Sequence, residues 1–561
     1  MKAAETLQQA RLALHSADFR TARACFDAVL RAVPAEQIRP ALWFGYACTL
    51  AALGELRAST ETIRYIGPDD RLALLQHPHT DRALADVLAV GWDAHQVQGL
   101  LCAYAMRQGR WEYRPGFVAA LEALAQRCAG VPLHRSLVFD AFSFGSDDGL
   151  IAALTRRFAD DHAPSPAARP AAASAPSPRT DGRLRIALLG GGFRRHPTYF
   201  LHRDVVAGLD RARLHLTGIY LDPDVDVYTD DLRGLCDAWQ HRAGEDPAEV
   251  AQAMRADGYD IVWSLGSFQQ SPVAEVLLHR PAQLIVNGLA SYYPHGRGLV
   301  DYAVIDPITV PPAAHAHWDE ALIEFPATPY VLGRGMPGAP AARPDRAALG
   351  LPADALVLAA THQSYKLSPE CLALWAAVLQ RCPQAVLWRL ESKPATDAAW
   401  RAGLARHGIG PEREWIAPAT SWAAHQARLG VADLFLDATP MGGHTTLLEA
   451  LAQGVPAVTV LGPGPAGRIG HAILQAVGLD DACTATAREY VESVARWAAD
   501  GSLRRRWREQ LQQHLPGGPH LSPALDPARQ ARWWEQAFTR IWQRHLQGLP
   551  PASLRIVDEA Q

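Results

Sequence analysis

The sequence lacks the features that mark secreted, metal-binding and membrane-spanning proteins. Its eight cysteines contain no CxxC pair and no His/Cys group at zinc spacing, which favours buried thiols in a reducing compartment. No stretch reaches about 18 uninterrupted apolar residues, and the amino-terminal residues alternate charged and apolar side chains instead of forming a signal-peptide core. We therefore expect a cytoplasmic protein that has no disulfides and does not contact a membrane.

The chain also lacks an excess of either charge. Lysine plus arginine total 54 and aspartate plus glutamate total 58, which gives a net charge of -4. Such a balance provides no general attraction for nucleic acid, so we expect no nucleic-acid partner. A hydrophobic content of 48% over 561 residues is enough to fill several cores, and two to four domains are expected.

Residues 161–182 are rich in proline, alanine and serine and predict a linker. Before it, residues 1–160 repeat apolar side chains at helical spacing and predict an all-α domain. Residues 16–34 match the second half of a tetratricopeptide repeat, and a weaker copy follows at 43–66. Because two imperfect copies are too few for a free-standing solenoid, we expect this domain to lean on the rest of the chain. A helical cap without true repeats is the alternative.

After the linker, short β-branched runs alternate with amphipathic helices, which is typical of parallel α/β sheets. The pattern predicts two Rossmann-like lobes, residues 183–340 and 341–561, that face each other across a cleft in a GT-B layout. The predicted strands are 184–189, 214–221, 261–265, 284–287 and 303–305 in the first lobe and 355–360, 385–390, 415–417, 434–436 and 457–461 in the second.

The strongest local signal is DLFLDATPMGGHTTLLEALAQGVP, residues 433–456. A buried strand ends in a Pro/Gly turn, and His444, Thr445 and Thr446 then open a helix whose free amides and positive dipole end favour a diphosphate. Glu449, one turn later, is placed to accept hydrogen bonds from ribose hydroxyls. A capping box made by Thr and Glu, with no ligand, is the alternative.

Two further segments carry polar side chains toward the expected cleft. Gln363 and Lys366 follow the strand 355–360, and a fixed ammonium there could neutralise charge on a leaving diphosphate without a metal. His425 and Arg428 lie on one helical face, where the ring could stack on a nucleobase while the guanidinium helps to hold it. A solvated loop and a surface helix are the respective alternatives.

In the first lobe, a strand runs through glycines 190–192 to His196. A neutral imidazole at the mouth of the cleft could accept a proton or position an acceptor, and a histidine that only caps the next helix is the alternative. Asp224-Val-Asp226 has the form of a DxD metal motif, but it lies in an acidic loop without a companion histidine or acidic strand. We therefore expect no metal and no resident cofactor.

Residues 184–545 resemble the O-GlcNAc transferase family, which includes bacterial protein N-glucosyltransferases of the adhesin-modifying type. The resemblance implies an inverting GT-B transferase that uses a UDP-sugar as co-substrate, needs no metal and modifies proteins. The segments that carry it, in order, are RLRIALLGGGFRRHPT, DGYDIVWSLGS, RPAQLIVNGLA, DYAVID, THQSYKLSP, PQAVLWRL, HQARLGVADLFLDATPMGGHTT and GVPAVTV.

The resemblance also implies a role for each matched residue. His196 matches the active-site histidine of the first lobe. The residues that match UDP-sugar contacts are Gln363, Lys366, His425, Arg428, His444, Thr445, Thr446, Arg468 and Glu449, the last replacing the usual aspartate.

Three departures from the family pattern leave the nucleotide site nearly intact. GLASYYPHG replaces the usual GYPGTSG, Trp422 replaces a lysine, and the surroundings of Arg468 differ. The sugar and the acceptor are therefore open, with GlcNAc on Ser/Thr side chains favoured and with the helical domain recruiting the acceptor protein. The alternatives are an N-glucosyltransferase acting on asparagine, a transferase to a small molecule or glycan, and a non-catalytic repeat protein.

Overall fold

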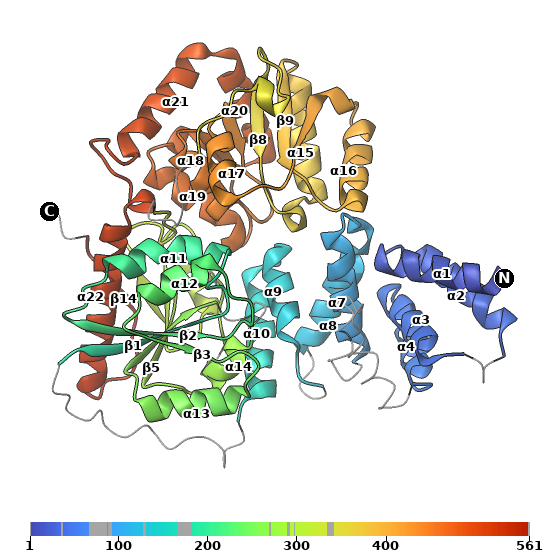
Figure 1. The fold of residues 1–561 in the computed structure, drawn as a ribbon, viewed down its shortest axis with the longest axis horizontal. Helices are drawn as coiled ribbons and strands as arrows, with labels where there is room; N and C mark the ends of the chain where they lie inside the picture. Colours follow the sequence, from blue (N-terminus) through green and yellow to red (C-terminus); the bar gives the residue numbers. More distant parts are fainter. Residues whose placement is uncertain are drawn as a thin grey trace.

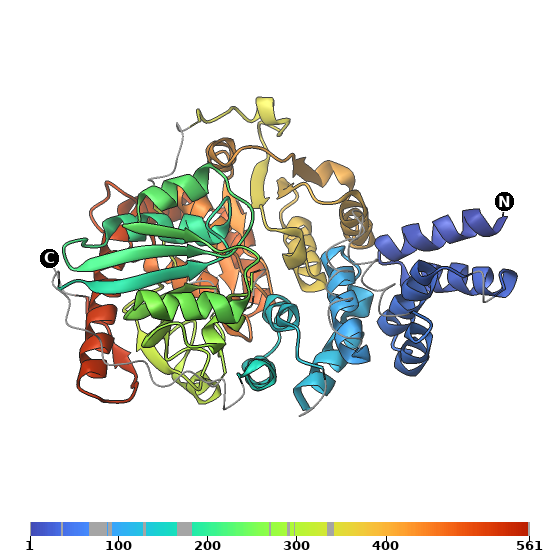
Figure 2. The same cartoon turned by 60° about the horizontal axis from the view of Figure 1, so that its bottom comes forward.

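The computed structural model describes residues 2–34, 38–66, 87, 93–126, 131–164, 182–266, 268, 271–288, 292–296, 298–333 and 341–558. Within these residues the chain forms a helical domain and two α/β lobes, with the first lobe below the second and the helical domain beside both (Figure 1). The amino terminus lies at the end of the helical domain that is farthest from the lobes (Figure 2). This arrangement confirms the predicted fold, an α-helical domain followed by two Rossmann-like lobes.

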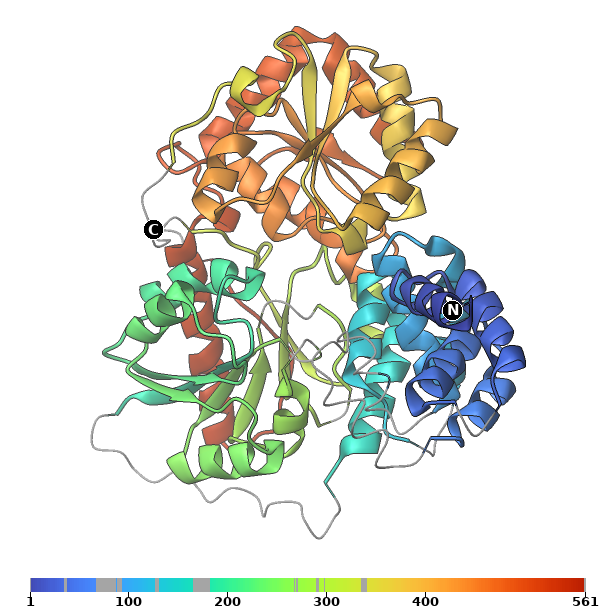
Figure 3. The same ribbon diagram turned by 45° about the vertical axis from the view of Figure 1, so that its right-hand side comes forward.

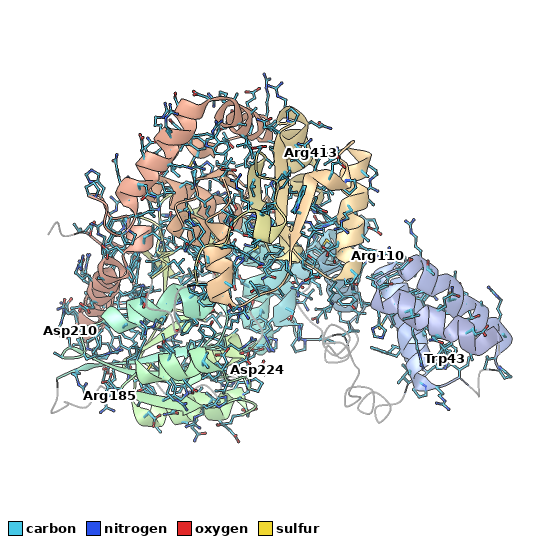
Figure 4. The ribbon with its side chains drawn as sticks, turned by 45° about the horizontal axis from the view of Figure 1, so that its top comes forward. Trp43, Arg110, Arg185, Asp210, Asp224 and Arg413 are labelled. Atoms are coloured by element: carbon cyan, nitrogen blue, oxygen red, sulfur yellow. The ribbon has the colours of Figure 1, made fainter. Side chains whose placement is uncertain are left out.

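The helical domain consists of antiparallel helices whose apolar faces meet. Phe19, Ala22 and Phe26 of α2 are buried, as the repeat pattern predicts, and Asp18 caps that helix by accepting a hydrogen bond from the Thr21 amide. Arg110 ties the outer helices to the inner ones, because its Nε donates to the Ser16 carbonyl at 3.1 Å (Figure 4). The helices are α1 Lys2–His15, α2 Phe19–Ala32, α3 Pro40–Ala52, α4 Leu56–Ile63, α7 Ala94–Arg107, α8 Arg114–Gln126, α9 Arg135–Ser143 and α10 Asp148–His162.

The helical domain packs against both lobes. Gly145, at φ +77°, lies so close to Pro440 of the second lobe that a Cβ at this position would fall 2.6 Å from the proline ring. On the first lobe, the ring of Phe142 meets Tyr293 with centroids 4.9 Å apart, and Arg156 pairs with Asp319 at 2.7 Å. The expectation that this domain leans on the lobes is therefore confirmed.

The first lobe contains one parallel sheet in the order β14-β7-β6-β5-β4-β1-β2-β3. Helices α11 Pro197–Gly208, α12 Val227–Gly234, α13 Pro247–Asp257 and α14 Val273–Leu278 connect its strands. The strands are β1 Leu184–Gly190, β2 Leu214–Tyr220, β3 Ala238–His241, β4 Ile261–Leu265, β5 Leu284–Asn287, β6 Tyr302–Ile305, β7 Ala321–Glu324 and β14 Leu554–Arg555.

The second lobe repeats this plan with a parallel sheet in the order β10-β9-β8-β11-β12-β13 (Figure 3). Its strands are β8 Leu356–Ala360, β9 Ala385–Leu390, β10 Glu414–Ala417, β11 Leu434–Leu436, β12 Ala457–Val460 and β13 Cys483–Thr484. Its helices are α15 Pro369–Arg381, α16 Pro394–Arg406, α17 Trp422–Leu429, α18 Thr445–Ala452, α19 Pro465–Ala476, α20 Ala487–Ala499 and α21 Gly501–His514.

In each sheet the strand order reverses beside the lobe's first strand. The switch points lie between β1 and β4 and between β8 and β11. At such points the loops at the carboxyl ends of neighbouring strands diverge and leave a crevice. The two lobes therefore present their crevices as the places where a ligand can enter.

Two predicted boundaries need correction. Helix α22, Pro527–Leu546, packs on α11, and β14 pairs with β7, so the end of the predicted second lobe, 341–561, belongs to the first lobe. Trp534 of α22 lies with its ring centroid 4.5 Å from that of Trp263 in β4, and this apolar contact holds the chain end there. The predicted linker, 161–182, begins too early, because α10 continues to His162; its residues 165–181 lie outside the described ranges.

Candidate functional site

A cavity of about 780 Å³ opens where the helical domain and the two lobes meet. This is within the range of volumes typical of ligand pockets. The first lobe contributes the loop after β1, the second lobe contributes the loops after β8, β9, β10 and β11, and the helical domain contributes faces of α7 and α9. The cavity therefore lies at the switch points of both sheets.

Nine of the ten predicted site residues line this cavity: His196, Gln363, Lys366, His425, Arg428, His444, Thr445, Thr446 and Glu449. They come from four loops or helices that are up to 253 residues apart in the chain, as counted from His196 to Glu449. No local sequence pattern requires these segments to meet, so the tertiary fold assembles the group.

One corner of the cavity is the start of α18. His444 occupies the position before the first helical residue without a side-chain hydrogen bond to the helix, whereas Ser or Thr side chains cap α15, α17 and α20. The buried Oγ1 of Thr446 also has no hydrogen-bond partner among the described residues. The first-turn amides thus face the cavity without a side-chain acceptor, as an anion site requires, and the capping-box alternative is wrong.

Lys366 brings a buried positive charge to the same corner. It ends the short 3₁₀ helix Ser364–Lys366, its Nζ donates to the Gly442 carbonyl at 2.6 Å, and only 8% of the residue is exposed. Burial lowers the pKa of Lys366 to about 8, although the nearby Asp437 carboxyl opposes this shift. The ammonium is therefore still the main form at neutral pH, and an incoming anion would stabilise it further.

Asp437 supports the turn beneath this corner. Its carboxyl accepts hydrogen bonds from Thr459 Oγ1 at 2.7 Å and from the Ala438 amide at 2.9 Å, and it also accepts one from the Gly443 amide. Burial raises the pKa of Asp437 to about 6, while these donors act in the opposite direction. The carboxylate therefore fixes the glycine turn that carries His444 toward the cavity.

The opposite corner contains His425, Arg428 and Glu449. Arg428 Nε donates to His425 Nδ1 at 3.1 Å, so the neutral imidazole carries its proton on Nε2, which lies 4.0 Å from Glu449 Oε2. Burial, followed by the charges of Arg428 and Arg195, lowers the pKa of His425 to about 4. The ring is a neutral flat surface beside a carboxylate, a combination that suits a nucleoside.

His196 both caps a helix and lines the cavity, so the two readings of this residue are compatible. The Thr198 amide donates to His196 Nδ1 at 3.2 Å at the start of α11. Burial and the charge of Arg194 lower the pKa of His196 to about 4. Because Nδ1 accepts hydrogen bonds, the neutral ring carries its proton on Nε2, which makes it a hydrogen-bond donor and a weak base.

Arg468 is not among the residues that line this cavity, so its contact with a UDP-sugar stays a prediction. Its guanidinium pairs with Asp148 of α10 at 3.5 Å and donates to the Thr309 carbonyl at 3.4 Å. These partners belong to the helical domain and the first lobe, so Arg468 joins the three units. The match in sequence was to a single residue whose surroundings differ, and the structure places it in α19 and not in a loop.

The acidic DxD segment serves the fold. Asp226 caps α12 by accepting hydrogen bonds from the amides of Tyr228 and Thr229, and its second oxygen accepts one from the Arg195 amide at 2.8 Å. Asp224 lies on the first lobe (Figure 4). Among the described residues no group of three or more His, Cys, Asp or Glu is arranged to hold a metal ion. Asp226 therefore has a structural role, since it anchors the loop that carries His196.

Sequence reasoning missed Lys393 and Arg195 on the cavity wall. A signal for the first was available, because the chain has only three lysines, Lys2, Lys366 and Lys393, and two of them line this cavity. Arg195 gave no such signal. Its Nη2 donates to the Thr420 carbonyl at 2.8 Å across the lobes, a contact that only the folded chain creates.

Comparisons with known proteins agree with this fold. Residues 341–517 match the model of glycosyl transferase family 41. The structure is similar to that of a mutant of the Thermobaculum terrenum O-GlcNAc transferase, with a TM-score of 0.69 and 24% identity over 97% of this chain and 98% of the other. That likeness covers the helical domain as well as both lobes, so it supports the fold of the whole chain.

Two curated relatives have similar sequences. One is the probable UDP-N-acetylglucosamine–peptide N-acetylglucosaminyltransferase SEC of Arabidopsis thaliana, 24% identical over 83% of this chain and 48% of its own length. The other, the probable enzyme of the same kind named SPINDLY from Oryza sativa subsp. japonica, is 28% identical over 57% of this chain and 34% of its own length. The matched region thus spans about half of these relatives or less.

No helix among the described residues is long and apolar enough to cross a membrane.

Proposed function

We propose that this chain is a member of the O-GlcNAc transferase family of glycosyltransferases and that it transfers a sugar from a UDP-sugar to protein side chains. One observation carries the proposal: a single cavity contains an open helix start, a buried ammonium and an imidazole beside a carboxylate. A nucleoside diphosphate offers two phosphates, a ribose diol and a planar base, and each has a matching partner here.

The proposed placement of the donor follows from these partners. The diphosphate lies at the start of α18, where the amides of Thr445 and Thr446 and the Lys366 ammonium face it. The uracil stacks on His425, and the ribose hydroxyls donate to Glu449. This order points the sugar toward His196 and the helical domain, which also line the cavity.

We propose an inverting displacement as the reaction. The acceptor oxygen bonds to the anomeric carbon on one face while the bond from that carbon to the β-phosphate oxygen breaks on the other, and the acceptor proton passes to solvent or to a phosphate oxygen. Lys366 and the α18 amides stabilise the charge that develops on UDP, so a divalent cation is not needed. His196 donates its Nε2 proton as a hydrogen bond to hold the acceptor or the sugar, because a pKa of about 4 makes it a poor base.

The identities of the sugar and the acceptor are proposed from the names of the relatives and from the walls of the cavity. The names of the curated relatives favour GlcNAc and a peptide acceptor, and serine and threonine are the side chains that we propose. The third wall of the cavity, from α7 and α9, gives the helical domain direct access to an acceptor that lies over the sugar. An N-glucosyltransferase that modifies asparagine is the second candidate, because GLASYYPHG, the segment expected near the sugar and the acceptor, departs from the family pattern.

A ligand panel and a mass measurement test the proposal. Thermal-shift assays with UDP, UDP-GlcNAc, UDP-glucose, UDP-galactose and a GDP-sugar should show stabilisation by the uridine compounds only. Intact-mass analysis of candidate acceptors co-expressed with the enzyme should then show one added hexose or N-acetylhexosamine. A treatment that removes only O-linked sugars would distinguish modification of serine or threonine from modification of asparagine. Absence of stabilisation by every uridine compound would refute the proposed function.

A further inference from the structure

Trp422 connects the carboxylate of the nucleoside corner to the first lobe. It is the first residue of α17, and its indole N–H donates to Glu449 Oε1 at 2.9 Å. Its ring stacks on Phe200 of α11 with centroids 5.3 Å apart and planes at 15°. All three residues line the cavity, so one side chain contacts both lobes at the place where the ribose is proposed to bind.

The surroundings of Glu449 make this hydrogen bond important. Glu449 is 5% exposed and lies in α18, the helix whose start forms the anion corner. The charged and titratable groups that face it are Arg195 from the first lobe and His425 from α17, with Arg428 behind that ring. His425 Nε2 is 4.0 Å away, longer than a hydrogen bond, so Trp422 supplies the one close side-chain donor recorded for this carboxyl in the described part of the chain.

A ribose diol requires a carboxylate in a defined state and direction. Its two hydroxyls donate most strongly to an ionised carboxylate, and a protonated carboxyl loses part of that capacity. Burial opposes ionisation, whereas a donated N–H favours it and also fixes which oxygen is left for the ligand. Trp422 uses Oε1 and leaves Oε2 on the side where His425 lies.

We propose that Trp422 is a positioning residue for the nucleotide: its indole N–H directs the Glu449 carboxyl at the ribose hydroxyls and favours its ionised form, and its stack on Phe200 keeps the indole in place. This inference rests on the proposed function, because it requires a nucleotide in the cavity. The aromatic stack would also make ribose binding sensitive to the position of the first lobe, which carries His196.

Trp422→Phe is the main variant, since it keeps an aromatic ring for the stack and removes the N–H. Calorimetry would compare UDP with 2′,3′-dideoxy-UDP, which lacks both ribose hydroxyls. We expect the wild-type protein to prefer UDP by about tenfold or more, as for a hydrogen bond to a charged group. The variant should lose most of this preference through weaker UDP binding, while its affinity for the dideoxy compound stays within about twofold.

The pH dependence gives a second readout. Burial raises the pKa of Glu449 to about 7, and the bond from Trp422 and the charge of Arg195 act against that rise. Removing the N–H should raise this pKa further. As the pH is lowered, UDP affinity should therefore begin to fall at a higher pH in the variant than in the wild type. In turnover assays the KM for the donor should rise about tenfold, with kcat within about threefold.

Two further variants separate the parts of the inference. Trp415→Phe is the matched control, because Trp415 also donates its indole N–H within the second lobe, to the Gly350 carbonyl, but lies outside the cavity lining; its nucleotide preference should equal that of the wild type. Phe200→Leu removes the stack and keeps the N–H, and it should reduce the preference for UDP by about threefold.

The outcomes distinguish this inference from the proposed function. A wild-type protein that binds neither nucleotide would contradict the proposed function itself. A wild type that prefers UDP, together with a Trp422→Phe variant that has the same preference and the same pH dependence, would refute only the role of Trp422. Equal weakening of both nucleotides in that variant would also refute it, since a general loss of structure would not depend on the hydroxyls.

Discussion

Replacing Lys366 with methionine tests the electrostatic part of the proposed reaction. Methionine is similar in length to lysine and has no charge, so it removes the ammonium that faces the diphosphate corner and fills most of its space. With a pKa of about 8, about nine-tenths of the Lys366 side chains are charged at pH 7. Loss of one neutral donor from such a site typically lowers turnover by about 10² to 10³, and loss of a full charge should cost at least about 10³.

The same substitution should not destabilise the protein. The pKa of Lys366 falls from 10.5 to about 8 on folding. Keeping this ammonium charged in the folded protein at pH 7 therefore lowers the free energy of unfolding by roughly 3 kcal/mol. Methionine removes that cost together with the hydrogen bond to Gly442, so the variant should melt at or above the temperature of the wild type. Inactivity with an unchanged or higher Tm would separate loss of charge from loss of fold.

The pKa of Lys366 gives folding stability and sugar transfer opposite dependences on pH. The unfolded chain binds more protons than the folded one between the folded pKa of about 8 and the unfolded value of 10.5, so stability from this residue rises with pH across that window. Transfer should do the opposite, since kcat/KM falls as the free enzyme loses the ammonium above pH about 8. A bound diphosphate raises the pKa, so kcat should fall only at a higher pH.

The assay is UDP release from the preferred UDP-sugar, with an acceptor found by the mass measurement, for the wild type, Lys366→Met and Lys366→Ala. Lys366→Ala should abolish transfer as well, and it should also be less stable than Lys366→Met because it leaves an empty space. Turnover of Lys366→Met within about threefold of the wild type would show that the ammonium does not stabilise the leaving group, and the electrostatic mechanism would have to be abandoned.

Further predictions concern the other residues of the cavity. Glu449→Gln should make UDP affinity nearly independent of pH, whereas calorimetry on the wild type should show weaker binding as pH falls through about 7, since protonation removes an acceptor for the ribose. His425→Ala should weaken UDP binding by about tenfold and His425→Phe by less, because the phenyl ring can still stack; equal losses would argue against stacking. His196→Ala should lower kcat by about 10² with UDP affinity within about twofold, and a weakened affinity instead would place this residue on the nucleotide. Turnover should be unchanged by EDTA, and restoration of activity by Mg²⁺ after chelation would contradict a metal-independent reaction.

Much of the fold could be predicted because central strands have a strong local signal. Ile261–Leu265 and Leu284–Asn287 are fully buried on both faces, and the predicted bounds are the same as those of β4 and β5. The strands β3, β7, β13 and β14 were not predicted, because they contain two to four residues each and lie toward the edges of the sheets. Short edge strands have few buried positions, so alternation and hydrophobicity do not mark them.

Site residues could be predicted where a single segment of the sequence contains the whole pattern. Residues whose role depends on contact between two distant segments were missed. The turn and helix at His444 could be recognised from residue order alone, since a strand, a glycine turn and a helix start follow one another. Arg195 and the partnership of Trp422 with Phe200 depend on contact between two lobes, and Arg468 was assigned to the UDP-sugar although its partners lie in the other two units.

The sequence by itself determined which segments become helices and strands, where the anion-binding turn lies and which side chains carry charge, because these depend on neighbours within a few residues. The tertiary structure alone decided that the last helix and strand return to the first lobe and that α7 and α9 form the third wall of the cavity. It also decided that burial lowers the pKa of Lys366 and raises that of Glu449. The physical reason is that burial and long-range packing depend on segments far apart in the chain, and these properties exist only once those segments have come together.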